Sequence, residues 1–401
     1  MSWDLRILFL QHYFYELPQC NKGSIKTSRS NGFSDSSCKV LFKKNNTNQE
    51  RMIQDKKFTS SNLQQFAQSI FTKIGFSSED ATTIAQALIM ANLRGVDTHG
   101  VNRIPLYLKF LKTGAMNPNP HIHIINDSPA VAVLEADRAS GPVAMKVAQK
   151  IILEKAKATG IGLVMIRQTT HTAALGYYTN QLAQEGLISI AMTASKPLMN
   201  YFGAKGAGVS TAPISIAVPG PAHDPIVLDM STGAISYGML LQHKSLNQPI
   251  PSGLAQDDFG NPTTDPSKAT IPMPLGGPKG SGLALMIELI SAIAVSNPLI
   301  AEYFSNSPNA KRHSQNAWLL GIDTYRFCNK ETFQKDVLAT INGIKSLPVD
   351  MEVGEILAPG ERGNRMRDRR LIEGVPIPEG VLQELGEIAA HFNIQMPMHI
   401  A

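Results

Sequence analysis

The sequence predicts an α/β protein, in which a mixed β-sheet flanked by helices forms the core and a small helical unit lies at its edge. Two observations predict this class. Short apolar runs of strand-like composition alternate along the chain with longer segments of helical periodicity. Glycine and proline, at 31 and 25 of 401 residues, are frequent between these segments, where they form turns.

The first expected elements are helices. Ser60 or Ser61 can cap a helix that continues to about Gly75, because apolar residues recur every three or four positions. A second helix is expected over 77–94. A third follows after a short loop and ends near Gly114.

After Pro120 the pattern changes to strands separated by helices. Strand-forming runs occupy 121–127, 130–137, 160–168, 187–195, 214–220, 225–231 and 318–323. Helical periodicity occupies 141–159, 177–185, 283–295, 330–344 and 380–391. Because strands and helices alternate, these segments predict a mixed sheet with helices on its faces.

Residues 1–51 differ in composition from the rest of the chain. They contain eight Lys/Arg against four Asp/Glu, and from residue 21 to residue 51 they are rich in Ser, Asn and Lys, after an apolar and aromatic stretch at 5–15. A segment as polar as 21–51 buries too little apolar surface to order itself. Because Met52 begins a sequence typical of a protein start, we expect residues 1–51 to be disordered or to derive from a misplaced start codon. A targeting or docking tail is the alternative.

Charge and composition exclude several functions. The formal net charge is +5, of which residues 1–51 supply four, so no basic face for nucleic acid is expected in the rest. No apolar run of about 18 residues is apparent, so no membrane span is expected. Cys20, Cys38 and Cys328 lack metal-binding spacing, so no metal site is expected. So few cysteines are typical of a reducing compartment such as the cytoplasm.

Three clusters of residues could carry chemistry, and the first is DTHG at 97–100 with Arg103 and Tyr107. Residues 103 and 107 are four apart and would share a helix face. A guanidinium binds a carboxylate through two parallel hydrogen bonds. An imidazole exchanges protons near neutral pH, so His99 is a candidate acid or base. The alternative is an ordinary capping or loop histidine.

The second cluster is THTAALGYY at 170–178. His171 follows a strand-like run and precedes a helical segment. Because functional side chains collect at strand ends in such sheets, His171 is a second candidate acid or base. A polar turn that only caps the next helix is the alternative.

The third cluster is PLGGPKGSG at 274–282. Glycines allow a ligand to approach the backbone, and a helix start offers unpaired N–H groups to a phosphate, beside the charge of Lys279. A purely structural turn is the alternative. The spacing is not that of a P-loop, and no GxGxxG, GxSxG or HExxH pattern occurs. A dinucleotide would therefore be held without the Rossmann pattern.

Together these clusters resemble the malate/L-lactate dehydrogenase family that lacks a Rossmann fold, which includes ureidoglycolate dehydrogenase, sulfolactate dehydrogenase and 2,3-diketo-L-gulonate reductase. The resemblance runs from about Lys56 to the C-terminus. It rests on the motifs LRGVDTHGVNRIPLYL (93–108), THTAALGYY (170–178), IVLDMSTGAISYGML (226–240), GNPTTDP (260–266), PLGGPKGSGLALMIELI (274–290) and APGER (358–362). So many motifs in one order are not expected by chance.

The resemblance implies roles for individual residues. His99 matches the proton donor of the diketogulonate reductases, His171 the acid/base residue of ureidoglycolate dehydrogenase, and Arg103 the arginine that binds the substrate carboxylate. Thr98 and Tyr107 are implied neighbours of the substrate. The implied contacts of the cofactor, NAD or NADP, are Ser195, His223, Asp229, Met230, Ser231, Lys279, Gly280, Pro359, Gly360 and Glu361.

The sequence departs from the family pattern in three places. Ser210-Thr211-Ala212-Pro213 stands where relatives often have Gly-Thr-Asn-Pro, which removes an amide donor and acceptor near the site. Thr98 replaces a more common Ser and keeps the hydroxyl. Ser281 stands where Tyr is frequent.

These inferences divide the chain into the extension 1–51, a helical unit with the first catalytic motif (52–125), a core that binds cofactor and substrate (126–335), and C-terminal helices that pack with the helical unit (336–401). The resemblance implies a cytoplasmic homodimer that binds a small 2-oxo or 2-hydroxy acid. The predicted reaction is hydride transfer between that acid and NAD(P). Reduction of cyclic 2-imino acids and a non-catalytic dinucleotide-binding role are the alternatives.

Overall fold

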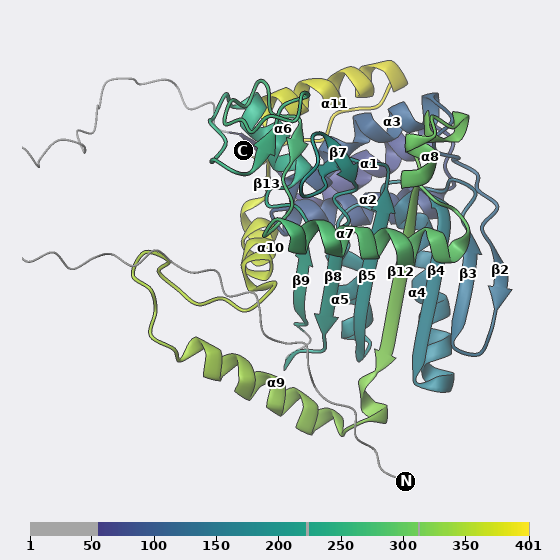
Figure 1. Cartoon of the computed structure of the whole chain (residues 1–401), viewed down its shortest axis with the longest axis vertical. Helices are drawn as coiled ribbons and strands as arrows, with labels where there is room; N and C mark the ends of the chain where they lie inside the picture. The colour runs from purple at the N-terminus through teal and green to yellow at the C-terminus, as the bar shows by residue number, and fades with distance from the viewer. Residues whose placement is uncertain (1–54, 222–223, 312, 401) are drawn as a thin grey trace, which may run out of the picture. The chain divides into compact units, whose positions relative to one another are not determined.

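The computed structural model describes residues 55–221, 224–311 and 313–400. The predictions for 1–51 and for His223 lie outside these residues. At the centre is a seven-stranded sheet in the order β2-β3-β4-β12-β5-β8-β9 (Figure 1). Its strands are β2 (His123–Asp127), β3 (Val131–Glu135), β4 (Ile161–Thr169), β12 (Gln315–Asp323), β5 (Leu187–Ser195), β8 (Ile214–Val218) and β9 (Ile226–Met230).

The predicted mixed sheet is confirmed. Only β3 and β4 run parallel, and every other pair of neighbours is antiparallel. β12 comes late in the sequence but lies between β4 and β5, antiparallel to both. The successive parallel strands of a Rossmann sheet are therefore absent from the central sheet, as the missing glycine pattern predicts.

Helices lie on both faces of the sheet (Figure 1). On one face α4 (Gly141–Thr159) and α5 (Gly176–Gln184) bury aliphatic and small side chains against β4, β12 and β5. On the other face α7 (Pro278–Ser291) crosses the strands in front of β5 and β12. Alternate residues of β3 and of the first part of β5 are buried, because successive strand side chains point to opposite faces.

α7 begins at Pro278, earlier than the predicted start at 283, because Gly276 and Gly277 adopt left-handed φ angles of 58° and 62° and turn the chain into the helix. The stretch Pro278–Val295, which includes the 3₁₀ turn η4 (Ile293–Val295), is long and apolar enough to cross a membrane by length and composition. The expectation that no such segment exists was wrong. One side of α7 nevertheless packs on the sheet, as core helices do.

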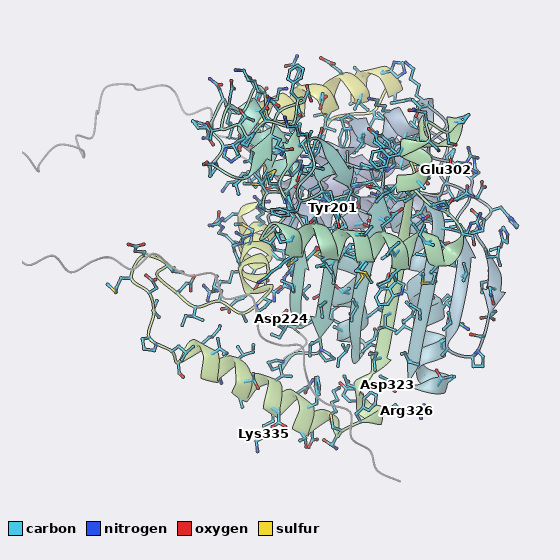
Figure 2. The ribbon with its side chains drawn as sticks, in the orientation of Figure 1. Tyr201, Asp224, Glu302, Asp323, Arg326 and Lys335 are labelled. Atoms are coloured by element: carbon cyan, nitrogen blue, oxygen red, sulfur yellow. The ribbon has the colours of Figure 1, made fainter. Side chains whose placement is uncertain are left out.

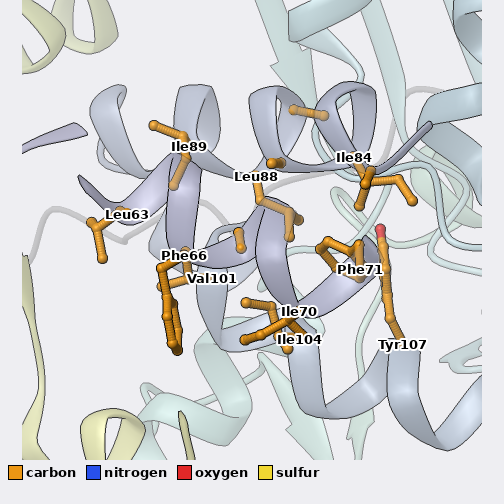
Figure 3. Packing of buried hydrophobic residues seen from close by; sticks show 14 of the residues in the cluster. Leu63, Phe66, Ile70, Phe71, Ile84, Leu88, Ile89, Val101, Ile104 and Tyr107 are labelled. Atoms are coloured by element: carbon orange, nitrogen blue, oxygen red, sulfur yellow. The ribbon is translucent and has the colours of Figure 1, made fainter. Parts of the chain in front are cut away.

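Segments from both ends of the described chain form the helical unit. β1 (Lys56–Phe58) pairs with β13 (Val375–Ile377). One apolar core joins four helices: α1 (Ser60–Lys73), α2 (Ser78–Leu93), α3 (Ile104–Lys112) and α11 (Glu379–Phe392). Figure 3 shows part of this core, with side chains of α1, α2 and α3. α1 is capped by Thr59 rather than by Ser60 or Ser61, because the Thr59 hydroxyl accepts from the N–H of Asn62.

The C-terminal region contains three helices, whereas the sequence predicted two. The helix that was missed is α10 (Glu361–Glu373), whose sequence ERGNRMRDRR has no apolar periodicity and which buries no residue. Polar contacts hold it instead. Arg370 donates to both carboxylate oxygens of Asp97, at 2.7 and 3.0 Å, and to the carbonyl of Asn92. α10 therefore fixes the loop that follows α2.

The other described elements are peripheral. α9 (Lys330–Lys345), on which Figure 2 marks Lys335, agrees with the predicted helix and buries no residue. At the end of β12, Arg326 lies 3.6 Å from Asp323 (Figure 2). The short elements not predicted are β6 (Met199–Asn200), β7 (Ala207–Val209), α6 (Tyr237–Ser245), β10 (Ala255–Gln256), β11 (Ile271–Pro272) and α8 (Ile300–Phe304).

Replacing Arg370 by Met should destabilise the protein by about 2 kcal/mol, because the half-buried Asp97 carboxylate loses two charge-assisted hydrogen bonds. The measurement is urea unfolding followed by circular dichroism. Arg369→Met on the same helix is the matched control, since in the described residues the Arg369 guanidinium donates only to the sulfur of Met366. Equal stability of the two variants would contradict a structural role for the Arg370–Asp97 pair.

Candidate active site

The first predicted cluster forms two 3₁₀ turns between α2 and α3, η1 (Asp97–His99) and η2 (Val101–Arg103). The buried side chain of Asn92 holds both turns. Its Nδ2 donates to Oδ1 of Asp97 at 2.7 Å, and its Oδ1 accepts from the N–H of Val101 at 2.9 Å. Asp97 thus positions the loop that carries His99. Asn92 was missed from the sequence, although a buried Asn inside the apolar run ALIMANL is the signal that could have found it.

His171 lies in the loop between β4 and α5. The hydroxyl of Tyr107 is 3.1 Å from both Nδ1 and the carbonyl oxygen of His171, and the N–H of Ala173 donates to the same Nδ1 at 3.3 Å. Because a backbone N–H can only donate, Nδ1 must accept. The neutral ring therefore carries its proton on Nε2, which leaves that nitrogen as the donor toward a ligand.

Tyr107 is completely buried in the core of the helical unit, where its ring centroid lies 6.0 Å from that of Phe71 (Figure 3). Its hydroxyl, which we expected beside the substrate, is engaged by His171. The direct effect of Tyr107 is therefore to position His171. Burial also raises the pKa of the phenol, so it remains a neutral hydrogen-bond donor.

The structure brings His99, His171 and Arg103 together. The two imidazole rings are stacked with their centroids 5.4 Å apart and their planes at 24°. Nδ1 of His99 lies 3.0 Å from the hydroxyl of Thr98, and Nε of Arg103 donates to the carbonyl of Thr98. Within the described residues no acidic side chain pairs with the half-buried guanidinium. A guanidinium in this state is suited to the carboxylate of a ligand.

The same arrangement keeps both imidazoles uncharged. Burial, and after it the positive charge of Arg103, lower the pKa of His99 to about 3. Burial also holds the pKa of His171 well below its usual range, with further contributions from Arg103 and His99. Both rings are therefore neutral at pH 7, and the positive charge of this group of residues resides on Arg103.

The residues implied to contact a dinucleotide lie at strand ends beside the start of α7. Ser195 ends β5, and Asp229, Met230 and Ser231 end or follow β9. The carboxylate of Asp229 accepts from the N–H of Gly176 at 2.7 Å. A Cβ at residue 176 would lie 2.8 Å from that carboxylate, so only glycine allows this contact without displacement.

The glycine-rich turn at 274–282 differs in one respect from the phosphate-binding role expected of it. The three N–H groups of residues 279–281 donate to carbonyl groups of the preceding turn, at 2.8 to 3.4 Å. The expectation that this helix start offers those groups to a phosphate was wrong, because the left-handed glycines fold the turn back onto them. The exposed ammonium of Lys279 remains available for a phosphate.

The segment 359–361 packs on the outer edge of β9, where the carbonyl of Pro359 accepts from the N–H of Val227 at 3.2 Å. Gly360 adopts a φ of 87° and precedes α10. The carboxylate of Glu361 pairs with Lys345 and Arg365 at 2.5 Å each, so this side chain is already engaged within the chain.

This set of groups fits a nicotinamide dinucleotide. Lys279 presents a positive charge suited to a pyrophosphate, and the exposed Asp229 presents a carboxylate of the kind that accepts from ribose hydroxyls. The turn and the end of β9 are joined directly, since the N–H of Leu275 donates to the carbonyl of Thr232 at 2.9 Å. Among the described residues no group of three His, Cys, Asp or Glu side chains could hold a metal ion.

Comparison with known proteins agrees with this geometry. The malate/L-lactate dehydrogenase family model matches residues 58–386. The chain belongs to this family. It is 35% identical to malate dehydrogenase of Pyrococcus horikoshii over 340 residues, which cover 82% of this chain and 94% of the relative. It is 29% identical to the NAD⁺-dependent ureidoglycolate dehydrogenase of Escherichia coli, over 82% of this chain and 95% of the relative.

Solved structures give the same result. The sulfolactate dehydrogenase of Methanocaldococcus jannaschii superposes with a TM-score of 0.75 at 33% identity, covering 85% of this chain and 98% of that one. The Δ1-piperideine-2-carboxylate reductase of Pseudomonas syringae superposes with a TM-score of 0.73 at 27% identity, covering 83% and 99%. The predicted family, fold and assignment as an oxidoreductase of 2-hydroxy acids are confirmed at the level of the family. The roles of single residues stay predictions.

The lowered pKa of His99 makes the stability of the protein depend on pH. The folded-state pKa of about 3 lies below the 6.5 of a free imidazole, so protonation favours the unfolded chain. The neutral ring makes its full contribution to the free energy of unfolding above pH 6.5 and loses it as the pH falls toward 3. At pH 5 the loss is about 2 kcal/mol.

His99→Gln removes this titration. Between pH 8 and pH 5 its free energy of unfolding, measured with urea, should therefore fall by about 2 kcal/mol less than that of the parent protein. His121→Gln, at an exposed position, controls for the substitution itself. The same pH dependence in His99→Gln and the parent would show that the ring is not held neutral.

Proposed function

We propose that this protein transfers a hydride between NAD or NADP and a small 2-oxo or 2-hydroxy acid. The observation that carries the proposal is the meeting of two neutral imidazoles with a half-buried guanidinium that has no acidic partner in the described chain. A substrate carboxylate would supply the missing negative charge. The malate, sulfolactate and ureidoglycolate dehydrogenases among the relatives support this class of substrate.

Each side chain has a distinct task in this reaction. Arg103 binds the carboxylate and so fixes the position of C2, and such positioning supplies a large part of a rate enhancement. When bound beside Lys279 and Asp229, the dinucleotide donates or accepts the hydride. His171 holds a proton on Nε2 and gives it to the carbonyl oxygen during reduction, or takes it from the hydroxyl during oxidation. His99 stacks on His171 and keeps its ring in place.

Substrate binding changes the electrostatics in the direction that catalysis requires. The charge of Arg103 is one of the causes that lower the pKa of both histidines. A bound carboxylate opposes that charge, so it raises both pKa values toward neutrality. Proton transfer is most efficient when the pKa of the acid lies near the working pH. The carboxylate therefore orients the substrate and also prepares the acid.

A second candidate function is reduction of cyclic 2-imino acids. The similarity to Δ1-piperideine-2-carboxylate reductase favours it, because such a substrate also places a carboxylate beside the atom that accepts hydride. Arg103 and His171 would act as in the main proposal. A non-catalytic dinucleotide-binding role is disfavoured, since the two stacked imidazoles and the guanidinium without an acidic partner in the described chain are all retained.

We also propose that the protein is a cytoplasmic homodimer with no nucleic-acid or membrane partner. The side of α7 turned away from the sheet exposes Leu283, Met286, Leu289 and Ile290 at 37–52% of their surface. Contiguous apolar surface of this kind supports a subunit interface. We propose that a second copy of the chain packs against this side of α7.

The catalytic assignment predicts that His171→Ala loses kcat by about 10²- to 10⁴-fold, because it removes the proton donor. His99→Ala should lower kcat by less, because it removes only the ring that holds His171 in place. Arg103→Ala should instead raise KM by a factor that corresponds to about 2–5 kcal/mol. Oxidation of NADH and of NADPH, followed by absorbance against a panel of 2-oxo acids and cyclic imines, measures both effects and separates the two candidate functions. His391→Ala, at an exposed position of α11, is the control. Unchanged rates in both active-site histidine variants would refute the assignment.

The interface proposal predicts that Met286→Asp combined with Leu289→Asp gives a monomer, because two carboxylates would then be desolvated in the interface. Light scattering after gel filtration measures the mass. Leu338→Asp on α9, also at an exposed position, is the control. A dimer that survives the α7 substitutions would place the interface elsewhere.

A further inference from the structure

A second polar cluster lies at the same end of the sheet as His171. The last residue of β4, the first of β12 and the last of β5 are directly paired, and neighbouring strands lie about 4.8 Å apart. His171, His313 and Lys196 stand one or two positions beyond these paired ends. The strand register therefore gathers the three side chains at one place, although the sequence separates them widely.

The imidazole of His313 is held against the helical unit. Its ring stacks on Phe110 with centroids 4.2 Å apart and planes at 12°. Phe110 in turn lies 6.5 Å from Tyr107, whose hydroxyl contacts His171. Nε2 of His313 is buried without a hydrogen-bond partner in the described chain. Buried polar atoms are rarely left unpaired, so this nitrogen is a candidate donor to an anionic ligand.

Lys196 supplies charge to this cluster. Its side chain is exposed and forms no ion pair within the described residues. Burial first, and then the charge of Lys196, lower the pKa of His313 to about 4. At pH 7 His313 is therefore a neutral donor beside a cation, a combination suited to an anionic group.

α3 sets the backbone spacing between Arg103 and Phe110, the residue on which His313 stacks. Arg103 immediately precedes the helix, Tyr107 holds His171 one turn later, and Phe110 carries His313 at the next turn. Residues 103 and 110 are separated by roughly 10 Å along a helix axis. A four-carbon dicarboxylate with a hydrogen bond at each end spans a similar length, on the order of 10 Å.

We infer that His313 and Lys196 form a second anion-binding subsite, which selects 2-oxo acids that carry a distal carboxylate or sulfonate. With the first carboxylate on Arg103, the reacting carbon lies beside His171 and the distal group reaches His313. The inference rests on the proposed function and narrows its substrate class. It also assigns a task to the buried Nε2 of His313, which the proposed reaction leaves unused.

The test compares kcat/KM for oxaloacetate, 3-sulfopyruvate and 2-oxobutyrate, the last of which has a methyl group in place of the distal anion. His313→Phe keeps the stacking on Phe110 and removes the N–H donor. Lys196→Met removes the charge. Lys244→Met, at an exposed position of α6, is the matched control.

We expect the parent protein to prefer one of the dianionic acids over 2-oxobutyrate by at least about 10-fold, since a hydrogen bond to a charged group is worth about that factor or more. Each variant should lower kcat/KM for that acid about 10- to 100-fold, mainly through KM, and leave 2-oxobutyrate within about twofold. The ratio between oxaloacetate and 3-sulfopyruvate identifies the preferred anion.

Three outcomes would overturn the inference. The parent protein could show no preference for a distal anion. Alternatively, the variants could lower kcat/KM for all three acids equally, as a purely structural role requires. In both cases the proposed hydride transfer stands. Turnover of none of the acids with either cofactor would refute the proposed function together with the inference. If His313→Phe fails to fold, Lys196→Met at its exposed position carries the test alone.

Discussion

The hydrogen bonds of the Tyr107 hydroxyl join the two parts of the active site. The ring of Tyr107 belongs to the core of the helical unit, whereas His171 belongs to the loop after the central strand β4. The contact is buried, so water cannot replace either partner at low cost. His99 and Arg103 lie on the same short segment as Tyr107. The contact of the Tyr107 hydroxyl with His171 therefore also fixes where this segment lies relative to His171.

Burial gives these groups their chemical character. A free imidazole is partly protonated near pH 6.5, but both rings are neutral in this site because the surroundings disfavour charge and because Arg103 is already positive. A cation without an acidic partner is costly to bury. An anionic substrate bound to Arg103 would reduce that cost. Binding and proton transfer are therefore coupled through the same charge.

Residues far from the reacting groups maintain this geometry. Arg370 of α10 and Asn92 of α2 hold Asp97, and Asp97 holds the turn that carries His99. Gly141 allows the loop of His171 to pass, since a Cβ there would lie 2.4 Å from the carbonyl oxygen of His171. The segment near the C-terminus thus orders a loop in the first third of the chain. These contacts are polar and join residues far apart in the sequence, so the periodicity of apolar residues does not predict them.

The sequence by itself determined the elements whose boundaries are local. The helix over 141–159 and the strand over 187–195 have the predicted bounds, because apolar periodicity and flanking glycines depend only on neighbouring residues. The histidines and Arg103 were also found in sequence, as reactive side chains in distinctive motifs. Tertiary structure alone decided the place of β12 between β4 and β5, the existence of α10 and the role of Tyr107. Each depends on residues distant along the chain. A contact between such residues stabilises the protein only after folding has brought the two segments together.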